Sequence, residues 1–113
     1  MPGMSFNLTN EELLEFERKS QDGDAEASTK LWLFYNFTLL DHDTAVQWLE
    51  KAAEQGLPAS QYSLAFDLSR RGSSGYNLEK AKYWATKAAN GGEELARTLL
   101  QQIKKLEELG NPT

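Results

Sequence analysis

Apolar residues recur along this chain at the three- and four-residue spacing that is typical of amphipathic helices. Between residues 45 and 53, for example, Ala45, Trp48, Leu49 and the pair Ala52–Ala53 share one side of a helix. No stretch shows the strict apolar–polar alternation that indicates a half-buried strand. The pattern predicts an all-α chain with six helices, over residues 10–21, 24–40, 42–55, 58–71, 78–90 and 93–109.

Polar residues with capping side chains precede three of these segments. Thr9 followed by Glu12 matches a capping box, in which side chain and backbone of the two residues bond reciprocally. Asp41 and Asn77 stand immediately before the third and fifth predicted helices, and both residue types are favoured as N-caps. These residues predict where the helices begin.

The pattern repeats after 36 residues. A shift of that length places Trp48 on Trp84 and Gly56 on Gly92, and a shorter signature, Gly-x-x-x-(Ala or Ser)-x-x-x-Leu, begins at Gly23 as well. A fixed period of about 20–50 residues is typical of repeat proteins, whose helix pairs bury their apolar faces by stacking. We expect the glycines to end helices at positive φ and the tryptophans to act as large fillers between helices.

Residues 48–65 resemble the Sel1-like repeat family, which is related to the tetratricopeptide repeat. They closely follow its pattern W-x-x-K-A-A-E-Q-G-x-x-x-A-Q-x-x-L-G, with Ser60 in place of the alanine and Ala65 in place of the second glycine. Residues 23–27 are a similar opening, and the resemblance covers roughly residues 11–105. It implies a short right-handed α/α solenoid of about six antiparallel helices.

The repeat pattern also predicts how one domain over residues 1–113 is divided. It starts each repeat at a glycine, and the first unit lacks the Gly-x-Gly loop that is usual between paired helices in this family. The predicted parts are an amino-terminal capping helix (11–22), a first repeat (23–55), a second repeat (56–91) and a carboxy-terminal half repeat (92–109).

Composition excludes several classes of function. The 113 residues fit a single domain, and the absence of cysteine excludes disulfides and thiol chemistry. A net charge of −5 argues against nucleic-acid binding, which requires clustered Lys and Arg. The most apolar stretch, residues 31–40, is too short to cross a membrane, and residues 1–10 resemble no secretory signal. The expected location is the cytoplasm.

Residues that could carry catalysis are few. His42 is the single histidine, whereas a metal site requires several converging ligands. The carboxylates lie mostly opposite the apolar stripes, and no pair of them stands out as an acid–base couple. Residues 70–75 combine two arginines with Gly and Ser but lack the closing Gly-Lys-Ser/Thr of a phosphate-binding loop. We therefore predict no enzyme, no catalytic residues, no cofactor and no metal.

The second predicted helix is apolar on three sides between residues 31 and 40. A helix that is hydrophobic all round is either buried on every side or exposes apolar surface to a partner. We expect burial between the first, third and fourth helices, with a partner contact on one side as the alternative.

The resemblance also implies a partner-binding face, because the first helix of each pair in such repeats lines the concave side. Leu31, Leu64 and Leu100 are matched as equivalent core positions for this purpose. The residues then expected on that face are Glu26, Thr29, Leu33, Asn36, Ala59, Tyr62, Phe66, Ser69, Leu95, Thr98, Gln102 and Lys105, with Phe37 and Arg70 adjoining. Its apolar and aromatic members form what we call the aromatic strip, which consists of Leu33, Phe37, Tyr62 and Phe66.

The predicted function is a non-catalytic protein–protein interaction module that binds another protein through this face. Its more specific form is a stoichiometric inhibitor such as a bacterial immunity or antitoxin-type protein, whose acidity suits a basic toxin or enzyme. The alternative is a homo-oligomerising adaptor or scaffold subunit of a signalling or secretion complex. This alternative rests on the sixth helix, whose apolar stripe reaches Leu106 and Leu109 beyond its partner.

Overall fold

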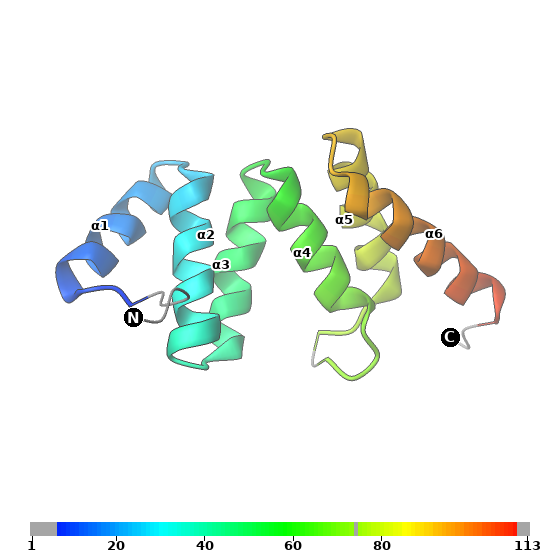
Figure 1. Ribbon diagram of the computed structural model, residues 1–113, viewed down its shortest axis with the longest axis horizontal. Coiled ribbons are helices and arrows are strands. Elements are labelled where there is room, and N and C mark those ends of the chain that lie inside the picture. Colours follow the sequence, from blue (N-terminus) through cyan, green and yellow to red (C-terminus); the bar gives the residue numbers. More distant parts are fainter. Residues whose placement is uncertain (1–6, 74, 111–113) are drawn as a thin grey trace. The chain divides into compact units, whose positions relative to one another are not determined.

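A computed structural model of the chain describes residues 7–73 and 75–110, and the regular structure of those residues is entirely helical (Figure 1). Residues 1–6 lie outside the described residues. They include most of residues 1–10, for which the sequence predicted no secretory signal. The elements are α1 (Asn10–Gln21), α2 (Ala25–Leu33), the π-helix η1 (Phe34–Thr38), α3 (His42–Glu54), α4 (Pro58–Ser69), α5 (Leu78–Asn90) and α6 (Glu94–Glu108). The all-α prediction with six helices is confirmed, and the helix ends agree within two residues except after α2.

The predicted caps are confirmed. The Thr9 hydroxyl accepts from the Glu12 backbone N–H at 3.1 Å, and the Glu12 carboxylate accepts from the Thr9 N–H at 2.9 Å. Asp41 caps α3 by accepting from the backbone of Thr44, and hydrogen bonds from Thr44 lower the pKa of the Asp41 carboxyl. Asn77 caps α5. Local side-chain chemistry therefore sets these helix starts.

The chain forms two compact units, Met1–Leu57 and Pro58–Thr113. In the first unit, α2 packs between α1 and α3. Its core combines a few large side chains with several alanines, which let the helices approach closely. The buried apolar residues are Ala27, Leu31, Phe34, Ala45, Leu49, Ala52 and Ala53.

A ring of hydrogen bonds lies inside this first unit. The Ser20 and Ser28 side-chain oxygens are 2.6 Å apart, and the Ser28 hydroxyl donates to Gln55 Oε1 at 2.8 Å. Because Ser28 has one hydroxyl proton and gives it to Gln55, Ser20 must donate to Ser28. Gln55 Nε2 then donates to the Ser20 carbonyl at 2.8 Å. The ring joins the end of α1, the first turns of α2 and the end of α3.

In the second unit, α5 packs against both α4 and α6. The apolar core is again rich in alanine, and it consists of Leu64, Ala65, Leu68, Leu78, Ala81, Ala85, Ala88, Ala96, Leu99 and Ile103. Leu100, which was matched with Leu31 and Leu64 as a core position, is only half-buried. Within this unit α6 packs against α5 and, less extensively, α4, and its buried residues there include Leu99 and Ile103.

The tryptophans are not the fully buried fillers that the sequence suggests, because Trp48 and Trp84 are both half-buried. At 100° per residue, each tryptophan lies at the edge of the buried side of its helix, and the buried alanines lie closer to the centre of that side. Lys51 lies over the Trp48 ring at 5.8 Å, and the Tyr83 ring meets Trp84 edge-on at 5.0 Å. We therefore expect smaller losses from truncating them than for buried tryptophans.

The second predicted helix is not one continuous α-helix. After Leu33 the backbone widens into η1, in which the Leu39 N–H bonds to the Phe34 carbonyl at 3.1 Å, five residues back. The Asp41 N–H then bonds to the Tyr35 carbonyl at 2.8 Å, and Leu40 has a positive φ of 55°. A non-glycine residue in this region is strained.

We predict that Ser28→Ala lowers the free energy of unfolding by about 1–3 kcal/mol, because it removes the partner of the buried Ser20 hydroxyl and of the half-buried Gln55 carbonyl oxygen. Ser20→Ala should cost less, and the Ser20→Ala/Ser28→Ala pair less than the sum of the two. Urea denaturation measures these differences. Ser69→Ala is the control, since its hydroxyl bonds only within its own turn. Equal effects of Ser28→Ala and Ser69→Ala would contradict a structural role for the ring.

A second prediction concerns Gly91, where an added Cβ would lie 2.8 Å from Cγ of the rigid Pro58 ring. Gly91 has φ −84°, which alanine adopts readily, so the ring contact is the main cost. Gly91→Ala should lower stability by about 1–3 kcal/mol, as overpacking does. The loss should shrink in a Pro58→Ala background, and Gly72→Ala, which meets no atom within 4 Å, is the control. An unchanged loss in both backgrounds would exclude this explanation.

Candidate partner-binding surface

The two units differ in charge, which the whole-chain value of −5 conceals. Residues 1–57 contain four Lys or Arg and eleven Asp or Glu, a net charge of −7. Residues 58–113 contain eight Lys or Arg and six Asp or Glu, a net charge of +2. Counting the halves of the sequence separately would have detected this asymmetry. A partner therefore meets different electrostatic surroundings on each unit.

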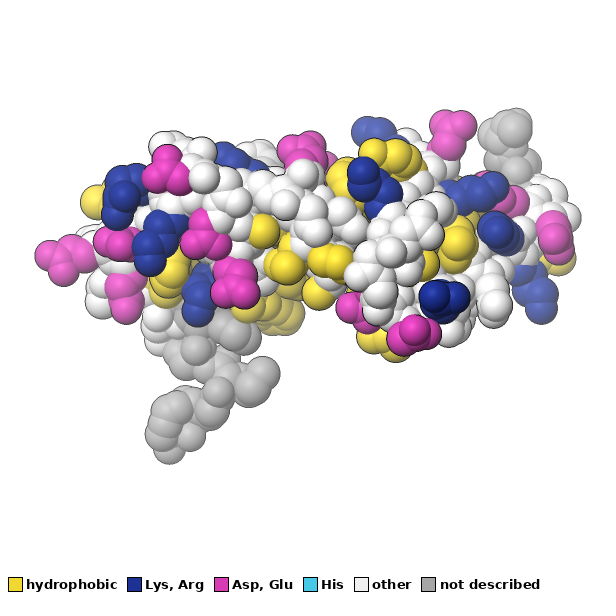
Figure 2. All heavy atoms as spheres, turned by 90° about the horizontal axis from the view of Figure 1, so that it is seen from above, with side chains coloured by type: hydrophobic (Ala, Val, Ile, Leu, Met, Phe, Trp, Pro, Cys, Tyr) yellow, Lys and Arg dark blue, Asp and Glu magenta, His cyan; other side chains and the backbone are white. Residues whose placement is uncertain are grey.

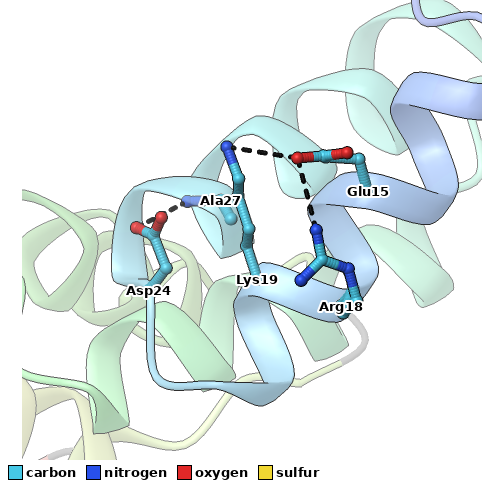
Figure 3. Close-up of polar contacts among 5 residues, drawn as sticks. All are labelled: Glu15, Arg18, Lys19, Asp24 and Ala27. Atoms are coloured by element: carbon cyan, nitrogen blue, oxygen red, sulfur yellow. Dashed lines mark hydrogen bonds and ion pairs between the residues drawn. The ribbon is translucent and has the colours of Figure 1, made fainter.

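Two of the four cations in the first unit are paired within α1. Glu15 lies 3.4 Å from Arg18 and 3.6 Å from Lys19, as Figure 3 shows. The same view shows Asp24 capping α2 through the Ala27 N–H at 3.3 Å. Exposed pairs of this kind add little stability. The pairs with Glu15 do offset the charges of Arg18 and Lys19, which are two of the few cations in this acidic unit.

The α4 members of the predicted face lie together. Tyr62 and Phe66 on α4 and Arg70, the first residue after it, follow one another at four-residue steps, and we call them the α4 column. The Tyr62 and Phe66 ring centroids are 6.3 Å apart, and the Arg70 guanidinium lies 5.8 Å from the Phe66 ring. Phe66 is 44% exposed although it is aromatic. Ser69 beside it donates to the Phe66 carbonyl at 2.7 Å, within the last turn of α4.

The α6 members of the face, Thr98, Gln102 and Lys105, are all exposed, as is the neighbouring Leu95. They follow one helix at steps of three or four residues and so share one side of α6. This side combines an apolar residue with a lysine, and the α4 column likewise combines apolar rings with an arginine. In Figure 2, hydrophobic side chains reach the surface among acidic and basic ones.

The first-unit members lie on α2 and η1. Glu26 is exposed, and Thr29 and Leu33 are half-buried. Asn36 Oδ1 lies 2.6 Å from His42 Nδ1, so the single histidine joins η1 to α3. Phe37 is 56% exposed and meets the Trp32 ring edge-on at 6.5 Å. The aromatic strip thus has Leu33 and Phe37 in the first unit and Tyr62 and Phe66 in the second, and its continuity stays a prediction.

The end of η1 and the turn that follows it expose three large apolar side chains, and we call Phe37, Leu39 and Leu40 the turn patch. Their exposed fractions are 56%, 53% and 68%. The expectation that this segment is buried on all sides is therefore wrong for these three residues, while Leu31 and Phe34 are buried. The sequence did contain a signal for this exposure. No glycine occurs between residues 33 and 55, so apolar residues have to form the turn between the two helices.

The ionisable groups of the described residues show no arrangement for metal binding. Within residues 7–73 and 75–110, no three His, Cys, Asp or Glu side chains gather where they could hold a metal ion. Tyr35 beneath the turn has a raised pKa, caused first by burial and then by the nearby carboxylates of Glu17 and Asp41. In the same part of the chain, no helix combines the length and apolarity needed to cross a bilayer.

Comparison with known proteins adds a family likeness. Residues 38–57 and 58–93 match the Sel1 repeat family model. The chain is 37% identical over 109 residues to the uncharacterized protein YibG of Escherichia coli K12, which covers 94% of this chain and 71% of that protein. It is 45% identical over 64 residues to the Sel1-repeat-containing protein YjcO of Escherichia coli K12, which covers 57% of this chain and 26% of YjcO. No solved structure matches significantly.

We predict that Leu40→Gly raises the free energy of unfolding by about 0.5–1 kcal/mol, because relief of left-handed strain exceeds the entropic cost of glycine. The mostly exposed Leu40 side chain loses little burial in the exchange. Leu39→Gly is the matched control, since Leu39 has φ −90° and carries no such strain. Urea denaturation that shows Leu40→Gly to be as destabilising as Leu39→Gly would disprove the strain.

Proposed function

Because this chain belongs to the Sel1-repeat family, whose α-solenoids generally mediate protein–protein interaction, we propose that it is a non-catalytic module that binds a partner protein through its repeat helices. The partner would cover the α4 column and the equivalent sides of α2 and α6. We include a cytoplasmic location in the proposal, with which the cysteine-free composition is compatible.

The α4 column carries this proposal. Phe66 is a large aromatic side chain that is almost half exposed, and Tyr62 and Arg70 hold it from both sides along the helix. Aromatic and arginine side chains dominate interface hot spots. A side chain that is ordered before binding also loses less entropy on association. Both properties favour a binding role for the column.

The finer form of the proposal is a stoichiometric inhibitor of the bacterial immunity or antitoxin type. The first unit, with a net charge of −7, complements a basic toxin or enzyme better than the whole-chain charge suggests. Arg70 in the α4 column complements a carboxylate on the same partner. The proposed partner therefore presents a basic surface to the first unit and at least one acidic group to the second.

The charge asymmetry also favours a second candidate, a homo-oligomerising adaptor. Leu95, Leu106 and Leu109 on or just after α6 are 59%, 39% and 77% exposed, which leaves an apolar side of the last helix uncovered within its unit. Opposite net charges on the two units would attract the first unit of one copy to the second unit of another. Sedimentation over a concentration range distinguishes this candidate from a monomeric binder.

We predict that Phe66→Ala reduces recovery of the partner from native lysate at least about tenfold, as loss of a hot spot does. Stability should change little, because the ring is substantially exposed. Tyr83→Ala is the matched control: Tyr83 is 55% exposed on α5 and lies under Lys87 at 5.5 Å, much as Phe66 lies under Arg70. Quantitative mass spectrometry of the captured proteins gives the comparison. Equal loss in both variants, or no loss in Phe66→Ala, would refute the proposed face.

A further inference from the structure

The turn patch has a feature that the α4 column lacks, namely backbone strain beneath an exposed side chain. Among the described residues, positive φ angles occur at Gly23, Gly56, Gly92, Gly110 and, as the single non-glycine case, Leu40. The turn patch lies where the chain passes from η1 into α3 (Figure 1).

Burial does not explain why leucine occupies this strained position. Its side chain is 68% exposed, so it gains little from the core of its own unit, and Leu39 beside it is 53% exposed. Glycine would adopt the same backbone without strain. Strained backbone conformations cluster at functional sites. The strain and the exposure of Leu40 together indicate that the side chain serves a contact outside the chain.

The surroundings of the turn patch are acidic. No Lys or Arg occurs between Lys30 and Lys51, whereas Asp41 and Asp43 follow the patch directly and are both exposed. Neither aspartate lies within ion-pair distance of a cation in the described part of the chain. Asp41 keeps a lowered pKa because Thr44 donates hydrogen bonds to it, so this carboxylate stays charged at neutral pH.

From this arrangement we propose that the turn patch docks a basic amphipathic segment of a partner protein. Apolar side chains of that segment cover Leu39 and Leu40, and its lysines or arginines pair with Asp41 and Asp43. An apolar centre with a charged rim is the usual anatomy of a protein interface. The inference does not rest on the α4 column, which lies in the other unit and carries a cation instead of carboxylates.

The test uses the full chain and three synthetic peptides of about 15 residues, a length at which helices are marginal in water and can order on binding. The first is built from Leu and Lys with all leucines on one helical side. The second replaces every Lys by Glu, and the third scrambles the first so that leucines lie all round. Isothermal titration measures affinity, and amide chemical shifts map the site.

We expect the Leu/Lys peptide to shift the amides of residues 37–43 and to bind at least about tenfold more tightly than either control peptide. Added salt should weaken binding of this peptide, because it screens the electrostatic attraction between the peptide lysines and Asp41 and Asp43. Leu39→Ser/Leu40→Gly should weaken binding about tenfold or more. Leu14→Ser is the matched control, since Leu14 is 66% exposed on α1 of the same unit and should leave binding unchanged.

A second matched pair of variants tests the charged rim that Asp41 and Asp43 form. Asp43→Asn and Glu54→Gln remove the same charge from exposed positions at opposite ends of α3. Asp43→Asn should weaken the Leu/Lys peptide several-fold more than Glu54→Gln does, since close charge pairs contribute most.

Three results would overturn the proposal. One is equal affinity for the Lys and Glu peptides, and another is binding that the Leu39→Ser/Leu40→Gly variant retains. The third is a concentration-dependent dimer that this variant abolishes and the Leu/Lys peptide does not displace, since the patch would then be covered by a second copy. Phe66→Ala should leave peptide binding intact, so failure here and failure of the α4 column are distinguishable.

Discussion

The first unit depends on the buried ring of hydrogen bonds among Ser20, Ser28 and Gln55. Both serines are completely buried, so their hydroxyls must find partners inside the protein. The ring closes only when the end of α1, the start of α2 and the end of α3 are in one register, because each contributes one member. Apolar packing alone tolerates small slips between alanine-rich helices. Directional bonds do not, and they therefore define the geometry on which η1 and its turn are built.

In the second unit, close packing takes the place of hydrogen bonds in setting the register of the helices. Gln55 and Gly91 both directly precede a repeat glycine, and Ala25 and Pro58 both follow one by two positions. Where the first unit has the side chain of Gln55, the second has Gly91 and the Pro58 ring in close approach. A polar ring specifies register by hydrogen bonding, and a proline against a glycine specifies it by exclusion. One repeat pattern thus permits two kinds of packing.

Helix existence, caps and the all-α class followed from the sequence because they depend on neighbours a few residues away, as at Thr9, Asp41 and Asn77. The α4 column followed from repeat spacing for the same reason, since residues four apart share a helix side. The half-burial of Trp48 and Leu100 did not follow from the sequence, because it depends on which neighbouring helices cover the edges of α3 and α6. Exposure of the turn patch was only the alternative to burial, because the sequence does not reveal the turn that the bond between the Asp41 N–H and the Tyr35 carbonyl closes.

That closing bond has a counterpart in the second unit, where the Asn77 N–H bonds to the Leu68 carbonyl at 2.8 Å. The second connection is three residues longer, and none of its described residues has a positive φ. The first must turn within a π-helix and a left-handed leucine, which brings apolar residues into the turn. A difference of three residues in connection length thus accounts for the different chemistry of the two turns. It leaves the first unit with an apolar turn that Asp41 and Asp43 follow directly.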